Sequence, residues 1–263
     1  MDKDIKLHLQ QVSRVVNPII SLRDVEVDFD GYKALNNINI DFPYKGVQFV
    51  IGPNGAGKTT ILDAICGRVK TSKGKIIYKE TTEVQNKKPE SIVHLGISRK
   101  FQNPTIFNTQ TVFENMKLAL LTGKRNIWYL FNHKITPEQI DIIDKTLLKL
   151  DLLEYKNSIS GSLSHGKKQW LEIAMSIIKD PELLLVDEPI AGMSPSERDK
   201  TGELLTEIGK EHTVLVVEHD MKFVSNFSSS VTVMHAGRII DRGSFDQIVN
   251  NEQVIEIYLG RQN

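Results

Sequence analysis

The segment Gly52–Thr59 constrains this chain more than any other feature of the sequence. It reads GPNGAGKT and fits the pattern G-x-x-x-x-G-K-[S/T] at every position. The apolar run Val47–Ile51 precedes it and a stretch with helical spacing follows it, which is the context of a phosphate-binding loop. Glycines let the backbone curl so that successive N–H groups point at phosphate oxygens, and a helix N-terminus adds partial positive charge. A glycine-rich turn that binds nothing is the alternative.

The loop supplies most of the expected nucleotide contacts. Lys58 is expected to reach the β- and γ-phosphates, and the Thr59 hydroxyl is expected to ligate Mg²⁺. The residues predicted to bind ATP within and beside the loop are Gly52, Pro53, Asn54, Gly55, Ala56, Gly57, Lys58, Thr59 and Thr60.

Two adjacent carboxylates, Asp187 and Glu188, follow the apolar run Leu183–Val186. Asp187 stands where a phosphate-binding loop needs a carboxylate to hold its metal ion. Glu188, directly after it, is placed to polarise an attacking water. The alternative is a pair of acidic side chains that only solvate the end of a strand.

The order of apolar segments predicts the fold class. Short apolar runs alternate with helical spacing in the second half of the chain, which indicates a parallel sheet with crossover helices. Residues 19–42 alternate with a period of two around a turn at Asp30-Gly31, as in antiparallel strands. Helices are expected over 59–69 and through most of 111–150. We therefore predict an α/β fold: a P-loop NTPase (RecA-like) core with an antiparallel β edge and an inserted α-helical subdomain.

Composition excludes several classes of protein. Of 263 residues, 33 are Lys or Arg and 33 are Asp or Glu, so the net charge gives no indication of a nucleic-acid partner. Cys66 is the single cysteine and cannot form an intramolecular disulfide. No apolar stretch approaches the ~20 residues of a membrane-spanning helix. We expect a cytoplasmic chain that reaches a membrane only through a partner.

Three further sequence elements indicate which class of P-loop protein this chain resembles. Leu163–Gln169, LSHGKKQ, resembles the ABC ATPase signature L-S-G-G-Q. Gln102 resembles the Q-loop glutamine, and His219, after the apolar run Val214–Val217, resembles the switch histidine. The order loop, Gln, signature, Asp-Glu and His is that of the ABC ATPases, and the resemblance runs from Ile19 to Gly260. It implies an N-terminal extension over 1–18 and an ABC nucleotide-binding domain over 19–263, with a helical subdomain over 98–168.

A closer resemblance suggests the kind of transporter. Gly96–Gln102, Thr111–Asn115 and Ala191–Met193 are similar to the ATPases of branched-chain amino acid transporters. Leu163–Ile173 and Val254–Gly260 are most similar to the ATP-binding subunit of urea importers. The resemblance implies an ATP-hydrolysing subunit of an importer for urea or a related small amide or amino acid. It would work at the cytoplasmic face of the cell membrane.

The family resemblance also implies residue roles. Two such subunits, identical or different, would close head to tail over two ATP molecules and drive permease subunits, served indirectly by a solute-binding protein. Ser164, His165 and Gly166 would form the signature that faces the partner chain's site, where Ser164 and Gly166 would contact the γ-phosphate. The catalytic set implied is Glu188, His219, Lys58 and Gln102, and the Mg²⁺ ligands implied are Thr59, Gln102 and Asp187. Phe29 would stack on adenine, with Tyr32 as the second candidate.

Departures from the family pattern leave alternatives open. His165 replaces a signature glycine, so we expect its side chain to point away from the phosphate. Ala191–Ser194 lacks the usual aspartate, so none is assigned there. An ABC ATPase of another class, either a soluble iron–sulfur assembly ATPase or a lipopolysaccharide-type exporter subunit, is the main alternative. A small-molecule kinase would lack the signature element.

Overall fold

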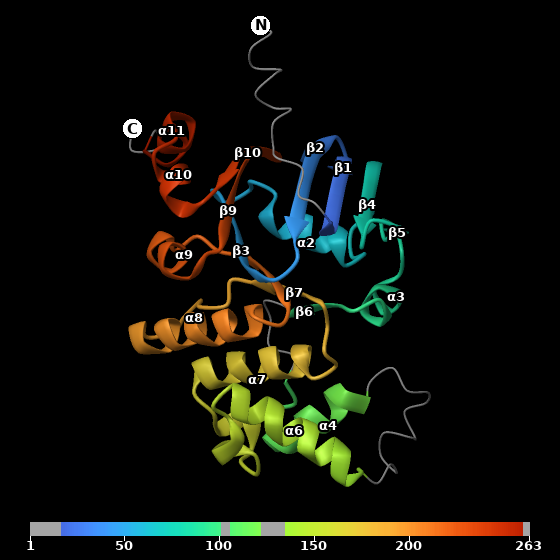
Figure 1. Cartoon of the computed structure of the whole chain (residues 1–263), viewed down its shortest axis with the longest axis vertical. Helices are drawn as coiled ribbons and strands as arrows, with labels where there is room; N and C mark the ends of the chain where they lie inside the picture. The colour runs from blue at the N-terminus through green and yellow to red at the C-terminus, as the bar shows by residue number, and fades with distance from the viewer. Residues whose placement is uncertain (1–16, 101–105, 122–134, 260–263) are drawn as a thin grey trace, which may run out of the picture.

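A mainly parallel sheet runs through the centre of the molecule (Figure 1). The computed structural model describes residues 17–100, 106–121 and 135–259. Within these ranges the central sheet has the strand order β10-β9-β3-β8-β7-β6, and only β10 runs antiparallel to its neighbour. Its strands are β3 (Gly46–Ile51), β6 (Ile97–Lys100), β7 (Leu183–Asp187), β8 (Thr213–Val217), β9 (Ser230–His235) and β10 (Arg238–Gly243).

A second sheet is antiparallel, with the order β2-β1-β4-β5. Its strands are β1 (Pro18–Phe29), β2 (Tyr32–Pro43), β4 (Lys73–Tyr78) and β5 (Thr82–Glu83). Asp30 and Gly31 both have positive φ, as a two-residue hairpin turn between right-twisted strands requires. The predicted antiparallel edge and its turn are confirmed.

Helices cover the central sheet and extend one end of the molecule. Figure 1 shows α4 and α6 stacked beyond α7, on the side away from the antiparallel sheet. The helices in the described ranges are α2 (Lys58–Ile65), α3 (Pro89–His94), α4 (Val112–Leu121), α6 (Pro137–Lys149), α7 (His165–Ile177), α8 (Pro195–Gly209), α9 (Met221–Phe227), α10 (Phe245–Val249) and α11 (Glu252–Leu259), with 3-10 turns η1 (Leu153–Tyr155) and η2 (Ser160–Ser162).

The two faces of the central sheet bury two separate hydrophobic cores. Side chains alternate across a strand, so Phe49 of β3 packs with the core that contains α7 and α8 residues. Its neighbour Val50 packs with the core formed by α2 and the antiparallel sheet. Because both faces are covered, β7 and β8 read as continuous apolar runs in the sequence. The predicted α/β class with a parallel core is confirmed.

The boundaries of several elements differ from prediction. The helix expected over 59–69 ends at Ile65, because Gly67 adopts φ +73° and turns the chain. Strand β6 was not predicted, since its sequence Ile-Ser-Arg-Lys has no apolar run. The expected start of the helical subdomain, residue 98, lies inside β6, where Ser98 pairs with Leu184 in the central sheet. The expected extension over 1–18 falls mostly outside the described residues, and Pro18 belongs to β1.

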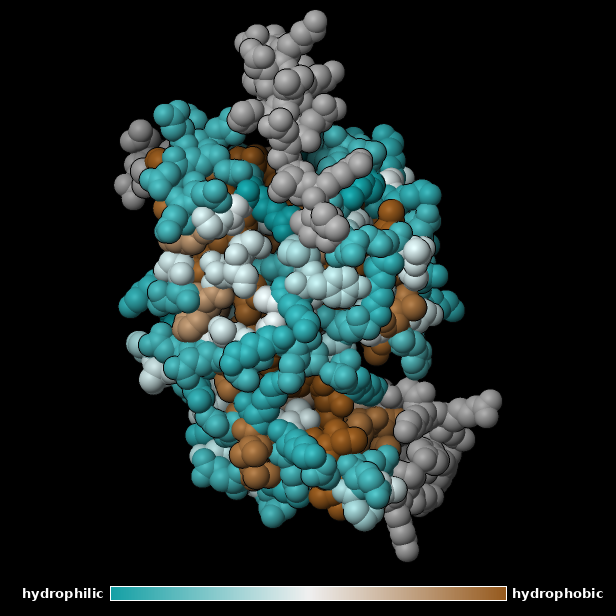
Figure 2. Space-filling view, viewed as in Figure 1, coloured by the Kyte–Doolittle hydropathy of each residue, from teal (hydrophilic) through white to brown (hydrophobic). Residues whose placement is uncertain are grey.

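Hydrophobic surface is uneven on the face seen in Figure 2. Most of that face is hydrophilic, while hydrophobic side chains gather over the helical end of the molecule. Among the described helices, none combines the length and apolarity needed to cross a membrane.

The close approach of α8 and α9 generates a stability prediction. A Cβ added at Gly202 of α8 would lie 2.2 Å from the Phe227 ring of α9. Alanine normally stabilises a helix interior relative to glycine by about 1 kcal/mol, whereas overpacking costs about 1–3 kcal/mol. We expect Gly202→Ala to lower the melting temperature in a calorimetric scan. Glu203→Ala, on the exposed side of the same helix, is the control, and a rise in melting temperature for Gly202→Ala would contradict the packing.

Candidate nucleotide-binding site

The site lies where β3, β7 and β8 end, at one edge of the central sheet. The loop that follows β3 leads directly into α2 and surrounds a cavity of about 300 Å³. Glu188, which follows β7, is far from the loop in the sequence but lines the same cavity. The residues that line the cavity are Asn54, Gly55, Ala56, Gly57, Lys58, Thr59, Thr60 and Glu188.

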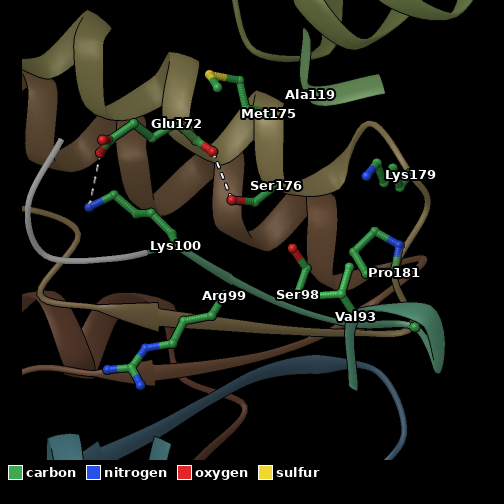
Figure 3. A pocket seen from close by; sticks show the side chains of 11 residues that line it. Val93, Ser98, Arg99, Lys100, Ala119, Glu172, Met175, Ser176, Lys179 and Pro181 are labelled. Atoms are coloured by element: carbon green, nitrogen blue, oxygen red, sulfur yellow. Dashed lines mark hydrogen bonds and ion pairs between the residues drawn. The ribbon is translucent and has the colours of Figure 1, made fainter. Parts of the chain in front are cut away.

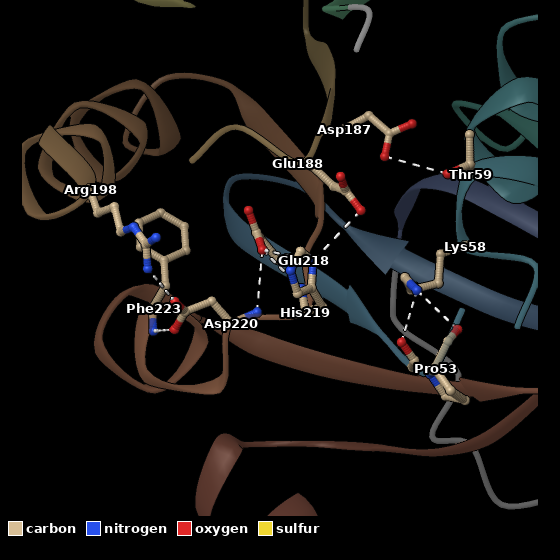
Figure 4. A network of polar contacts seen from close by, with 11 residues as sticks. Pro53, Lys58, Thr59, Asp187, Glu188, Arg198, Glu218, His219, Asp220 and Phe223 are labelled. Atoms are coloured by element: carbon tan, nitrogen blue, oxygen red, sulfur yellow. Dashed lines mark hydrogen bonds and ion pairs between the residues drawn. The ribbon is translucent and has the colours of Figure 1, made fainter. Parts of the chain in front are cut away.

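The Lys58 ammonium is held by the loop itself (Figure 4). Its Nζ donates hydrogen bonds to the carbonyls of Gly52, at 2.8 Å, and Pro53, at 3.1 Å. Burial lowers the pKa of Lys58, while the nearby carboxylates of Glu188 and Asp187 act in the opposite direction. These two carbonyl contacts hold the Lys58 ammonium against the phosphate-binding loop.

Asp187 and Thr59 offer hard oxygen ligands from two different elements. Asp187 is 2% exposed, and the Thr59 hydroxyl lies 3.5 Å from its Oδ1. Burial raises the pKa of Asp187, and the Arg99 guanidinium opposes that rise. Mg²⁺ is usually bound through one or two protein oxygens together with substrate phosphates, so this pair suits that ion.

Glu188 and His219 face each other from the ends of β7 and β8. His219 Nδ1 lies 3.6 Å from Glu188 Oε1, and the contact is drawn in Figure 4. Glu188 has φ +45°, a conformation that non-glycine residues adopt at a cost and that clusters at functional sites. Its backbone N–H donates to the Val217 carbonyl at 3.0 Å, which holds the strained residue at the sheet edge.

Glu218 is a site residue that the sequence reasoning missed. It is 1% exposed, and its Oε2 accepts the backbone N–H groups of His219, at 2.8 Å, and Asp220, at 3.3 Å. Asp220 in turn caps α9 and accepts a hydrogen bond from Arg198. The turn that carries His219 is therefore held from two sides. An acidic residue between an apolar strand and a candidate histidine was the available signal.

The signature residues lie outside this cavity. Ser164 is the N-cap of α7, and its hydroxyl donates to Glu197 Oε1 at 3.1 Å. The His165 ring contacts the Ala191 carbonyl at 3.0 Å, so Nε2 carries the proton and donates it. A Cβ at Gly166 would lie 2.5 Å from Glu197 Oε1, which shows how closely that carboxylate approaches the start of α7.

The remaining candidates divide between the described and the undescribed parts of the chain. Gln102 lies outside the described residues. Phe29 is exposed at the end of β1. Tyr32, the second aromatic candidate, donates from its hydroxyl to the Gly55 carbonyl at 3.4 Å and so touches the phosphate-binding loop.

Comparison with known proteins agrees with this geometry. A family model described as ABC transporter matches residues 35–191. The chain belongs to the ABC transporter family. It is 34% identical over 257 residues to the high-affinity branched-chain amino acid transport ATP-binding protein LivG of Escherichia coli (strain K12), covering 92% of this chain and 98% of that protein. It is also 34% identical over 249 residues to a probable LivG of Archaeoglobus fulgidus, covering 93% and 96%.

Solved ATP-binding cassettes share the fold. The ADP conformation of MJ1267, an ATP-binding cassette of an ABC transporter, superposes with a TM-score of 0.82 and 30% identity, over 94% of this chain and 100% of that one. A nucleotide-free cassette from an ABC transporter gives a TM-score of 0.80 at 30% identity, over 91% and 98%. This ABC cassette is an ATP-binding subunit and an ATPase, and its substrate is ATP with Mg²⁺.

Glu218 generates a prediction about pH. Burial raises the pKa of Glu218 above its value in the unfolded chain, so ionisation opposes folding as pH rises through the folded pKa. Glu218→Gln keeps an acceptor oxygen but cannot ionise. We expect its free energy of unfolding, relative to that of wild type, to increase from pH 5 to pH 8 in guanidinium titrations, because only wild type loses stability as Glu218 ionises. Glu90→Gln at an exposed position is the control, and an unchanged difference across this range would contradict the assignment.

Proposed function

We propose that this chain is the ATP-hydrolysing subunit of a membrane importer and works as one of a pair of cassettes, identical or different. One observation carries the proposal. The phosphate-binding loop and Glu188 line one cavity, whereas Ser164 and Gly166 lie outside it beside Glu197. A nucleotide in the cavity would therefore meet a signature only from a second chain, which supports head-to-tail closure.

The residues of the cavity support a direct hydrolysis mechanism. Lys58 would exchange its two loop carbonyls for β- and γ-phosphate oxygens, which carry full negative charge. Glu188 would accept a proton as a water oxygen attacks the γ-phosphorus, and ADP would leave. His219, 3.6 Å from Glu188, would hold the γ-phosphate and the attacking water. Thr59 and Asp187 would hold Mg²⁺, which would supply positive charge to offset that of the phosphates.

Closure of the pair would transmit this reaction to the membrane. Excluding water strengthens the electrostatic contacts in the site, and the partner's signature completes it. Gln102 is proposed to report nucleotide state to permease subunits at the cytoplasmic face of the membrane. A solute-binding protein would act on the other side.

The base assignment has a direct test. Glu188→Gln should lower ATP hydrolysis by about 10²–10⁴-fold, because a carboxamide cannot take the proton from water. Binding of a fluorescent ATP analogue should stay within about twofold of wild type, since the phosphate contacts remain. Both are measured on the transporter reconstituted with its permease. Glu182→Gln, at the other end of β7, is the matched control; a variant at Glu188 that still hydrolysed ATP would remove it from the role of base.

The transported solute is proposed on sequence similarity. The relatives named above are transport proteins for branched-chain amino acids. Within that type, residues 163–173 and 254–260 are most similar to urea importer subunits, so we assign urea or a related small amide as the solute. The ATPase subunit does not touch the solute, and relatedness alone supports this step.

Uptake measurements test the solute. In cells that lack this chain, wild-type protein should restore uptake of labelled urea at low concentration, and Glu188→Gln should not. Uptake of labelled leucine should be unchanged in all three strains. Restoration of leucine uptake alone would show that the solute is a branched-chain amino acid and not urea. The assignment of the chain as an ATPase would be unaffected.

A further inference from the structure

Strand β6 ends in two consecutive buried cations, Arg99 and Lys100, whose side chains are 4% and 1% exposed. Consecutive residues of a strand point to opposite faces of its sheet. Figure 3 shows this arrangement, with Lys100 directed toward Glu172 of α7 and Arg99 directed to the other side. Both residues line a cavity of about 370 Å³ beside α7, but the Lys100 ammonium lies 3.7 Å from Glu172, whereas the Arg99 guanidinium contacts Asp63 and Asp187 on the nucleotide side.

Arg99 joins the nucleotide-binding helix to the predicted metal carboxylate. Its Nη1 donates to Asp63 Oδ1 of α2 at 2.6 Å and lies 3.3 Å from Cys66 Sγ. Its Nη2 donates to Asp187 Oδ2 at 3.2 Å. A planar guanidinium has donors in a fixed fork, which allows one side chain to bridge two carboxylates that belong to different elements.

The contact distinguishes the two oxygens of Asp187. Arg99 takes Oδ2, whereas Oδ1 is the oxygen that lies 3.5 Å from the Thr59 hydroxyl. A hydrogen bond to one oxygen fixes the rotation of the carboxylate about its last torsion. The other oxygen then stays directed toward Thr59. Partners of this kind, which orient a ligand without touching the metal, strongly affect metal affinity.

We propose that Arg99 is a positioning residue for the Mg²⁺ site and orients Asp187 so that Oδ1 faces the ion. The proposal rests on the proposed function in one respect, the assignment of Mg²⁺ to Asp187. Arg99 acts mainly by orienting the Asp187 carboxylate and less by its charge, because Asp63 offsets its positive charge. A bare cation at that position would instead repel the metal ion.

The test is metal binding to the full chain. The protein is loaded with a non-hydrolysable ATP analogue and titrated with Mn²⁺, and the bound ion is followed by electron paramagnetic resonance. Arg99→Met should raise the Mn²⁺ midpoint by about 10–100-fold, as is typical when a partner of a metal ligand is lost. Arg99→Lys keeps the charge without the fork and should give a smaller rise. Arg23→Met breaks another Arg–Asp pair, with Asp41, and should leave the midpoint unchanged.

The double variant Arg99→Met with Asp63→Asn separates orientation from charge. It restores the local charge balance but not the hydrogen bond to Asp187 Oδ2, so the midpoint should stay raised. A return to the wild-type midpoint would mean that charge alone matters and would overturn the proposal. If Arg99→Met does not fold, Arg99→Lys carries the test, and a wild-type midpoint in that variant would overturn the proposal.

Asp187→Asn tells the two proposals apart. A wild-type midpoint in this variant would remove Asp187 from the metal site and so overturn both the assignment in the proposed function and the role of Arg99. A raised midpoint in Asp187→Asn, with wild-type midpoints in both Arg99 variants, would overturn the role of Arg99 alone.

Discussion

Parallel pairing of β7, β8 and β3 is the constraint on which the site depends. In register, Asp187 lies opposite Val217 of β8, and Val217 lies opposite Val50 of β3. Because the three strands run in the same direction, their carboxyl ends meet at one edge of the sheet. The phosphate-binding loop, the Asp187-Glu188 pair and His219 all follow these ends. The register therefore brings together groups that are far apart in the sequence.

That edge concentrates charge: Asp187 and Glu218 are buried, Glu188 is half-buried and His219 is exposed. An ionised carboxylate without partners is expensive to bury, so each group has contacts from a different direction. Arg99 binds Asp187 from the neighbouring strand β6, and His219 faces Glu188 from the turn that follows β8. Lys58 is held by backbone carbonyls, which a phosphate can replace at little cost because both offer oxygen acceptors. The carboxylates are therefore held in place before a nucleotide binds, whereas Lys58 can exchange its carbonyl partners for phosphate oxygens.

Several features were predictable because they depend on local pattern. The apolar runs of β3, β7 and β8 identify strands that are covered on both faces. Between such a strand and a helix, the glycine-rich motif indicates a phosphate-binding loop. Strand β6 was not predictable in this way, because Ser98, Arg99 and Lys100 are polar and are buried only through partners on other elements. Glu218 was missed for the same reason, since its role depends on the turn that it folds around.

The sequence by itself determined the chemistry: a phosphate-binding loop, two carboxylates after an apolar strand and a histidine after the next, in the order of an ABC ATPase. Only the tertiary structure decided which of these groups share a cavity. It placed Glu188 with the loop, and it placed Ser164 beside Glu197 outside that cavity. It also selected Arg99 as the partner of Asp187. The physical reason is that a motif depends only on residues close together in the sequence. Distances between groups on different strands depend on the register of the sheet and on the packing of helices against the two faces of the sheet.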